Sequence, residues 1–286
     1  MNTEYLILGN GFMGNKFHNF LENTIISDRK IHSARDIEEE IVRYNPRIVI
    51  NCIGNTGKVN IDWCETHKPE TFIGNVSVPL LILEACNKVG VKMVHLGTGC
   101  IYQGDNNGKG YSEDDKPNFE GSYYSRSKLT IEKMLKEFDV LQLRLRMPFD
   151  DFPSDKNLIN KLIGYEHIIN IPNSITYIPD FLEAAKTLLE NNATGIYNVV
   201  NKGAITHSEI LELYKEIVDS NIDYEIISLE ELYKITKAER SNCILSTEKL
   251  EKECKVRDVR EALEICLPKY KKELEKALLS TKQPKV

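Results

Sequence analysis

The sequence predicts an α/β fold: a Rossmann-type, doubly wound parallel sheet with a smaller C-terminal substrate-binding region. Three observations predict it. The apolar strand Tyr5–Leu8 runs into the glycine-rich turn Gly9–Gly14. Strand-like and helix-like apolar patterns then alternate through roughly the first 150 residues, as they do where helices join parallel strands. Finally, Tyr124 and Lys128 lie four residues apart on a helix that follows a strand ending near Thr98.

Composition and charge limit the class of protein. The chain has 286 residues, 41% of them hydrophobic and 28% charged, which suffices for one large domain or two closely packed ones. A net charge of −6 without a basic cluster argues against nucleic-acid binding. The polar start and the short apolar runs predict neither a signal peptide nor a membrane span. Seven cysteines without a Cys-x-x-Cys pair indicate reduced thiols, so we expect a cytoplasmic protein.

The glycine-rich turn predicts a dinucleotide site. It has the pattern G-x-G-x-x-G and lies between a strand and an amphipathic helix that ends near Leu21, the context that this fingerprint requires. The glycines let the backbone approach a pyrophosphate, and the helix N-terminus supplies free N–H groups. The predicted contacts are Gly9, Asn10, Gly11, Phe12, Met13 and Gly14.

The next strand, Thr24–Ser27, bears on the choice of cofactor. Asp28, Arg29 and Lys30 follow it directly. An acid at this point favours NAD by bonding the ribose 2′-hydroxyl, whereas cations favour the 2′-phosphate of NADP. The two cations favour NADPH, with NADH as the alternative.

The rest of the chain continues the alternation and then becomes less regular. In the first half we expect helices at Arg35–Tyr44, Trp63–His67 and Thr71–Val89 and strands at Arg47–Cys52 and Lys92–Leu96. In the second half we expect strands at Leu141–Arg146 and Ile196–Val200 and helices at Asn157–Tyr165, Asp180–Glu190, Ser208–Asp219, Ser228–Thr236 and from Val259 to the end. We therefore predict a cofactor-binding domain over 1–150 and a mainly substrate-binding region over 151–286, with 180–201 returning to the first domain.

Tyr124 and Lys128 are candidate catalytic residues. They share one face of a helix whose apolar residues are spaced i, i+3, i+4, i+7: Ile131, Met134, Leu135 and Phe138. An ammonium beside a phenol favours the phenolate, so we expect a lowered tyrosine pKa and proton exchange with a substrate oxygen near neutral pH. Thr98 ends its strand at the edge where open α/β sheets bind ligands.

Cys100 lies two residues beyond Thr98 and should face the same crevice. A free thiol has a pKa of about 8.5, which nearby cations lower. The alternative is that Cys100 is a small buried residue without a chemical role. We expect the remaining cysteines and His95 to be structural, and no spacing predicts a metal site. Those cysteines are Cys52, Cys64, Cys86, Cys243, Cys254 and Cys266.

Together these motifs resemble the extended short-chain dehydrogenase/reductase family. From Gly9 to about Leu250 the chain resembles one subfamily, the bifunctional nucleotide-4-keto-6-deoxyglucose 3,5-epimerases/4-reductases that complete activated L-rhamnose. The segments that carry this likeness are Val59–Glu65, Thr98–Ile101, Pro117–Phe119, Gly121–Ser125, Arg144–Pro148, Ile171–Ser174, Gly195–Asn198 and Arg240–Asn242.

The resemblance implies roles for five residues. Tyr124 would protonate the C4 oxygen as hydride arrives from NADPH, and Thr98 would bond the same oxygen. Lys128 would hold the nicotinamide ribose and tune Tyr124. Cys100 and Lys161 match the acid/base pair that inverts C3 and C5, whose hydrogens neighbour the C4 ketone. From the residues alone, Lys161 is a surface lysine on an amphipathic helix.

The resemblance also implies binding contacts and partners. The substrate is a UDP- or dTDP-linked 4-keto-6-deoxyglucose, and a homodimer is the expected assembly. Besides the turn, cofactor contacts are Arg29, Lys30, Asn51, Cys52, Gly54, Asn75, Tyr124, Lys128 and Met147. Substrate contacts are Asn55, Thr98, Cys100, Asn173 and Arg240, the last near the nucleotide diphosphate.

Two other functions compete with this one. A plain nucleotide-4-ketosugar reductase of the dTDP-4-dehydrorhamnose reductase type would need neither Cys100 nor Lys161. A non-catalytic regulatory subunit on the same fold, like the β subunit of methionine adenosyltransferase, is a third possibility that the fold alone leaves open. The intact set of Thr98, Tyr124 and Lys128 argues against it, because a binding module need not keep a proton donor.

Overall fold

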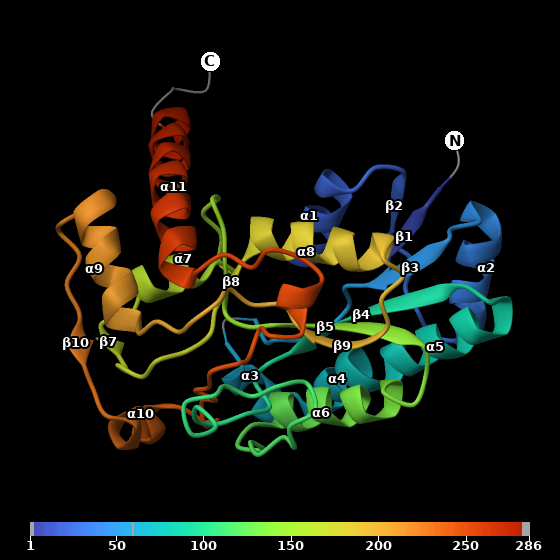
Figure 1. Ribbon diagram of the computed structural model, residues 1–286, viewed down its shortest axis with the longest axis horizontal. Helices are drawn as coiled ribbons and strands as arrows, with labels where there is room; N and C mark the ends of the chain where they lie inside the picture. Colours follow the sequence, from blue (N-terminus) through green and yellow to red (C-terminus); the bar gives the residue numbers. More distant parts are fainter. Residues whose placement is uncertain (1–2, 59, 282–286) are drawn as a thin grey trace.

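A six-stranded parallel sheet forms the centre of the protein (Figure 1). The computed structural model describes residues 3–58 and 60–281, so Val59 and the last five residues of the predicted C-terminal helix lie outside the described residues. The strand order is β2-β1-β3-β4-β5-β9, which confirms the predicted doubly wound α/β fold. The strands are β1 Tyr5–Leu8, β2 Thr24–Ser27, β3 Ile48–Asn51, β4 Lys92–Thr98, β5 Val140–Leu145 and β9 Gly195–Asn198.

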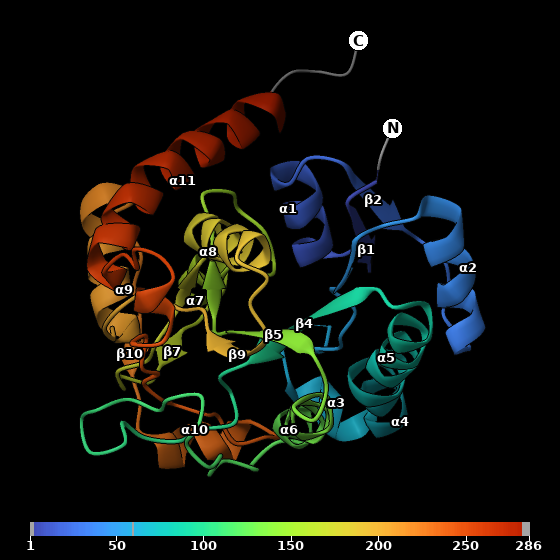
Figure 2. The same ribbon diagram turned by 45° about the vertical axis from the view of Figure 1, so that its right-hand side comes forward.

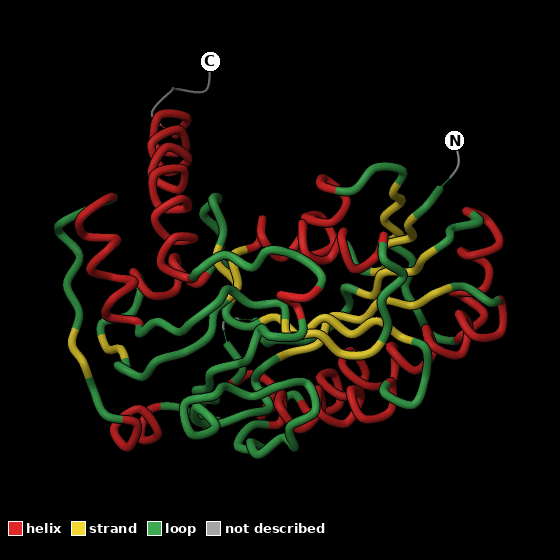
Figure 3. Tube along the Cα trace, in the orientation of Figure 1, coloured by secondary structure: helices red, strands yellow, loops and turns green. Residues whose placement is uncertain are grey.

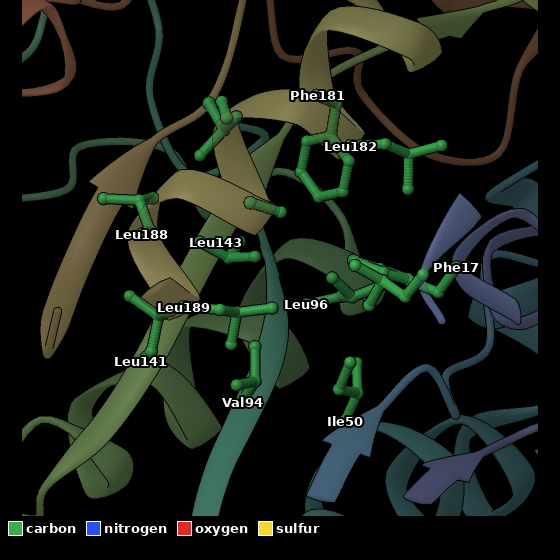
Figure 4. Packing of buried hydrophobic residues seen from close by; sticks show 14 of the residues in the cluster. Phe17, Ile50, Val94, Leu96, Leu141, Leu143, Phe181, Leu182, Leu188 and Leu189 are labelled. Atoms are coloured by element: carbon green, nitrogen blue, oxygen red, sulfur yellow. The ribbon is translucent and has the colours of Figure 1, made fainter. Parts of the chain in front are cut away.

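Helices cover both faces of the sheet, because alternate strand residues point to opposite sides. In β1, Tyr5 and Ile7 pack beneath α1 (Phe12–Phe20) and α8 (Ile178–Glu190), whereas Leu6 and Leu8 face the opposite layer. Figure 4 shows Phe17, Phe181 and Leu182 meeting strand residues such as Val94 and Leu143. The opposite layer contains α2 (Ala34–Tyr44), α5 (Val78–Val89) and α6 (Tyr123–Leu135).

The order of the strands fixes where a ligand binds. The chain leaves β1 to β2 on one side and returns to β3 on the other, so the topological switch lies between β1 and β3. Open α/β sheets bind ligands at the carboxyl ends of strands at such a switch. The glycine-rich turn after β1 and the loop after β3 both lie there.

The C-terminal region has a second core of its own. Apolar residues of α7 (Leu158–Ile163), α9 (His207–Ile217) and α11 (Val259–Thr281) pack together, including Leu162, Leu211 and Leu263. Figures 1 and 2 show α9 and α11 side by side, to one side of the sheet. Two short pairs join this region: β6 (Pro148–Phe149) with β8 (Thr176–Tyr177), and β7 (His167–Ile168) with β10 (Glu225–Ile226). The remaining helix there is α10 (Leu229–Ile235), and η2 (Leu250–Lys252) is a 3-10 turn.

Long loops run between the helices and strands, as the tube in Figure 3 shows. The loop 99–122 and the segment 236–249 are far apart in sequence but pair directly. Gly104 bridges to Cys243, and Tyr111 bridges to Leu245. This pairing brings C-terminal residues to the end of β4.

One expectation about the helices is wrong. Helix α6 ends at Leu135, and Ile131 and Leu135 are fully buried, but Met134 and Phe138 are 45% and 46% exposed. The apolar face is therefore narrower than the spacing indicated, and Met134 lies at its edge. The predicted helix Thr71–Val89 is confirmed as part of one continuous helical stretch, Lys68–Val89, which consists of α4 (Lys68–Phe72), a π-helical segment (Ile73–Ser77) and α5.

The same three pieces bear on the membrane prediction. By length and composition, the stretch Lys68–Val89 could cross a membrane, contrary to the expectation that no apolar run is long enough. Half of its apolar window is buried inside the protein, against the sheet and its neighbouring helices. A core helix passes the same test in this way, so the stretch carries little weight as a membrane span.

Candidate active site

Thr98, Cys100 and Tyr124 meet at the carboxyl end of β4. Thr98 is the last residue of the strand and is buried, and its Oγ1 accepts a hydrogen bond from the Cys100 backbone N–H at 3.1 Å. Tyr124 lies in the first turn of α6, where Ser122 caps the helix by accepting from the Ser125 N–H at 3.0 Å. The buried Tyr124 hydroxyl is hydrogen-bonded to Thr98 and lies close enough to Cys100 to sense its charge.

The protonation of Tyr124 differs from the sequence-based expectation. Burial is the main cause of a raised pKa for Tyr124, and the nearby Cys100 adds to it, while the hydrogen bond to Thr98 acts in the opposite direction. The expected lowering by Lys128 is therefore wrong. Lys128 instead donates to the Leu96 carbonyl at 2.6 Å and contacts His95 Nε2 at 3.2 Å.

Lys128 belongs to a buried polar chain that the sequence did not reveal. Burial lowers the pKa of Lys128 to about 8, and the charge of Glu132 opposes this shift. His95, which we expected only to pack in the core, links Lys128 to Asn51: its Nδ1 lies 2.9 Å from Asn51 Nδ2. The chain thus joins β3, β4 and α6. The sequence gives little indication of these polar contacts, because the position of His95 relative to α6 is known only from the folded sheet.

Cys100 is half-buried and contacts a residue to which we had given no role. Arg146 follows β5 directly, is 1% exposed, and its Nη1 lies 3.3 Å from Cys100 Sγ. Its Nη2 donates to Asn173 Oδ1 at 2.5 Å and to the Ser241 carbonyl at 2.6 Å. Arg146 therefore connects Asn173, a predicted substrate contact, with Cys100.

Lys161 stands apart from these contacts. It is half-buried on α7, and its side chain forms no hydrogen bond or ion pair with any described residue. Burial lowers the pKa of Lys161, and the positive charge of Lys156 lowers it further. A lysine in this condition releases its proton more readily than one on the surface.

The glycine-rich turn has the shape that the fingerprint requires. Gly9 has a φ of +106°, and a Cβ there would lie 3.0 Å from the backbone N of Ile53. A Cβ on Gly14 would collide with the Gly9 carbonyl oxygen, so α1 packs closely on the turn. Asn10, which precedes α1, accepts a hydrogen bond at 3.0 Å from Asn15 Nδ2 in that helix. By contrast, a Cβ at Gly11 would meet no heavy atom within 4 Å, so the turn is open at its centre, in front of the N-terminus of α1.

Asn75 fixes the loop after β3. Its Oδ1 accepts from the Asn55 N–H at 2.7 Å, and its Nδ2 donates to the Asn55 carbonyl and to Ser127 Oγ, each at 3.0 Å. Asn75 lies in the π-helical segment Ile73–Ser77, and π-helical turns are frequent at functional sites. Gly54 is confined by the same side chain, because a Cβ there would lie 3.3 Å from Asn75 Oδ1.

Two predicted binding cations are held by carboxylates. Arg29 bonds Asp36 at 2.9 Å and Glu39 at 2.7 Å, while Lys30 is exposed. Arg240 forms two bonds to Asp62, at 2.8 and 3.0 Å.

Two further cofactor candidates follow the carboxyl ends of β5 and β3. Met147 has a φ of +40°, which is uncommon outside glycine and often marks functional sites. Cys52 is half-buried, and its N–H bonds the Leu8 carbonyl at 2.9 Å.

Comparison with known proteins gives consistent matches. Residues 16–160 match the family model described as the RmlD substrate binding domain. A bifunctional dTDP-4-dehydrorhamnose 3,5-epimerase/dTDP-4-dehydrorhamnose reductase of Arabidopsis thaliana is 38% identical over 231 residues, which are 78% of this chain and 77% of that protein. The crystal structure of the L780 UDP-rhamnose synthase from Acanthamoeba polyphaga mimivirus superposes with a TM-score of 0.89 at 33% identity, covering 94% of this chain and 100% of that one.

The fold extends to more distant structures. The dTDP-4-dehydrorhamnose reductase of Bacillus anthracis, solved in complex with NADP, has a TM-score of 0.78 at 21% identity and covers 93% of this chain and 99% of that one. At this identity the likeness concerns the fold.

Proposed function

The chain belongs to the RmlD family and, within it, to the rhamnose-forming 3,5-epimerase/4-reductase enzymes, and from this premise we propose that it converts a nucleotide-linked 4-keto-6-deoxy-D-glucose to the L-rhamnose nucleotide. The observation that carries the proposal is the convergence of Thr98, Cys100 and Tyr124 at the end of β4: the Thr98 hydroxyl bonds both the Cys100 backbone N–H and the Tyr124 hydroxyl, and Cys100 lies near enough to influence Tyr124. An epimerase and a reductase acting on one sugar need a proton-transfer group and an acid in the same crevice.

The reduction step uses Tyr124 and Thr98. Tyr124 donates its proton to the C4 oxygen, and the raised pKa of Tyr124 supports this role because the phenol is protonated at neutral pH. Thr98 bonds the same oxygen. NADPH, when bound, supplies the hydride, and the Gly9–Gly14 turn is suited to its pyrophosphate. Lys128 orients the nicotinamide ribose.

The epimerisation step uses Cys100 and Lys161. The Cys100 thiolate removes the proton at C3 or C5, and the C4 ketone takes up the electron pair as an enolate. Lys161 returns a proton from the opposite face. The lowered pKa of Lys161 supports such an exchange, because proton transfer is most efficient when a group's pKa lies near the working pH.

The cofactor and setting complete the proposal. We infer a preference for NADPH from Arg29 and Lys30, a UDP or dTDP carrier, a cytoplasmic setting and a homodimer. We also infer a boundary between cofactor and substrate regions near residue 150. Both classes of nucleotide occur among the relatives, since the mimivirus protein is described as a UDP-rhamnose synthase and the Arabidopsis protein by a dTDP substrate.

The test separates the two activities. The 4-keto-6-deoxyglucose nucleotide is incubated in D₂O without NADPH, and deuterium at C3 and C5 is followed by NMR. Cys100→Ala should abolish uptake at the carbons that Cys100 deprotonates, whereas Lys161→Met should retain uptake without inversion. With NADPH added, both variants should yield unepimerised 6-deoxyhexoses. Cys254→Ala, a half-buried cysteine on another part of the chain, is the matched control.

Normal deuterium uptake and L-rhamnose formation by Cys100→Ala would leave a plain 4-ketosugar reductase as the better description. Absence of any turnover by the unmodified protein with either nucleotide would favour the regulatory-subunit alternative.

A further inference from the structure

Arg146 carries a buried charge without a carboxylate partner. It is 1% exposed, and its contacts are neutral groups: Asn173 Oδ1, the Ser241 carbonyl and hydroxyl oxygens, and the sulfur of Cys100. Its Nε has no hydrogen-bond partner. No described Asp or Glu lies within ion-pair distance of the guanidinium. A buried charge in this condition is costly unless an anion compensates it.

Arg144 shows what the same strand does with an ordinary structural arginine. It lies two residues earlier, is also 1% exposed, and donates to both oxygens of Glu132 at 2.8 Å. Arg144 is therefore neutralised within the protein. Arg146, two residues further along the chain, is not neutralised in this way.

The group that could compensate Arg146 is Cys100. The titratable groups that face this thiol from neighbouring elements are Tyr124 on α6, Cys243 in the 236–249 segment and Arg146 after β5. Among these described groups Arg146 alone is a cation. The charge of Arg146 also acts on His207. Burial is the main cause that lowers the pKa of His207 to about 4, and the charge of Arg146 contributes to the shift.

We propose that Arg146 is a positioning residue that holds Cys100 as a thiolate, with its Nη1 donating to the sulfur. The inference deepens the proposed epimerisation and rests on it for its role in turnover. In the step, the C–H bond at C3 or C5 breaks, its proton forms the Cys100 S–H bond, and its electron pair remains on the enolate. Arg146 keeps its own protons throughout. Lys161 then protonates the carbon and becomes a neutral amine, and passage of the Cys100 proton through solvent to that amine restores both the thiolate beside the guanidinium and the ammonium of Lys161.

The experiment measures the ionisation of Cys100 directly. The intact protein is alkylated with iodoacetamide at a series of pH values, and the rate at Cys100 is followed by peptide mass spectrometry. Arg146→Met keeps an unbranched apolar stem, which is shorter because the guanidinium is missing, and removes the charge. Because an opposite charge within a few ångströms lowers a thiol's ionisation midpoint by about 1–3 pH units, the midpoint should rise by that amount. Arg146→Lys, which keeps a charge, should shift it less.

Ser241→Ala is the matched control. It removes a neutral partner of Arg146 at 3.0 Å and leaves the cation in place, so the midpoint should stay within the error of the measurement. A purely structural role for Arg146 predicts the reverse: Arg146→Met and Ser241→Ala would both change melting temperature, and neither would move the midpoint.

Two outcomes would overturn the inference. One is an unchanged midpoint in folded Arg146→Met. The other needs no variant and applies if Arg146→Met fails to fold: a midpoint in the unmodified protein at or above about 8.5, the value of a free thiol. The deuterium assay keeps the two proposals apart. If the alkylation midpoint shifts in Arg146→Met but the unmodified protein shows no exchange at C3 or C5, the role of Arg146 stands and the epimerase is rejected. If exchange occurs but the midpoint does not shift, the epimerase stands and the role of Arg146 is rejected.

Discussion

Replacing Lys128 by Met should stabilise the fold at neutral pH while abolishing reduction. Lys128 is 7% exposed, and burial lowers its pKa from an ordinary value of 10.5 to about 8. At about 1.4 kcal/mol per pH unit, keeping it charged in the folded protein costs about 3 kcal/mol at pH 7. Methionine loses the bond to the Leu96 carbonyl, which is worth about 1 kcal/mol. The net expectation is a variant about 2 kcal/mol more stable at pH 7.

The difference in stability between Lys128→Met and the unmodified protein should depend on pH. Below pH 8 the lysine is protonated in both the folded and unfolded states, so the cost is present in full. Between about pH 8 and 10.5 the folded state releases its proton first, and the stability of the unmodified protein rises with pH. Lys128→Met lacks this rise, so its advantage should shrink with pH and vanish before pH 10.

Urea unfolding followed by circular dichroism at pH 7 and pH 9.5 measures both quantities. Lys249→Met is the control: Lys249 also donates to a carbonyl, that of Ile196 at 2.7 Å, but it is only half-buried. It should show no gain at pH 7. A Lys128→Met variant that is less stable at pH 7, or whose difference from the unmodified protein is the same at both pH values, would refute the reasoning.

Two further predictions concern reduction and the cofactor. Tyr124→Phe should slow NADPH oxidation by about 10²–10⁴-fold with little change in NADPH binding, because only the proton donor is lost; near-normal turnover in a stopped-flow assay would remove Tyr124 from its role. Exchanging Arg29 and Lys30 for Ala should weaken NADPH far more than NADH in fluorescence titrations. Glu39→Gln should strengthen NADPH, because it releases one of the two hydrogen-bonded carboxylates that now hold Arg29. Equal affinity of the unmodified protein for both cofactors would contradict the preference.

The central sheet was predictable because its signals are local. Strands such as Ile48–Asn51 are short apolar runs, and the turn at Gly9 needs a conformation that glycine adopts freely. Alternation of strand and helix then leaves few topologies, since parallel neighbours require a crossover. The details that failed are those that tertiary packing decides, such as the exposure of Met134 and Phe138 on α6.

The surroundings of the candidate catalytic residues were less predictable. His95 and Arg146 contact Lys128 and Cys100 only because separate strands and loops converge, and neither contact has a sequence spacing of its own. The pairing of the loop 99–122 with the segment 236–249 brings Ser241 to Arg146, although these two residues lie 95 positions apart in the sequence. Such contacts follow from the fold and cannot be inferred from periodicity.

The partners of the buried and half-buried cations divide them into two groups. Arg29, Arg144 and Arg240 each bond a carboxylate, so any phosphate that approaches the two nucleotide-binding candidates must compete with an anion already in place. The buried Lys128 and Arg146, like the half-buried Lys161, bond no described carboxylate; Lys128 donates to the Leu96 carbonyl of β4, and Arg146 contacts Cys100 just beyond that strand. Proton abstraction beside the C4 ketone puts negative charge on that oxygen, and preorganised unpaired cations stabilise such charge most strongly. The proposed chemistry therefore explains why these two charges are left without partners.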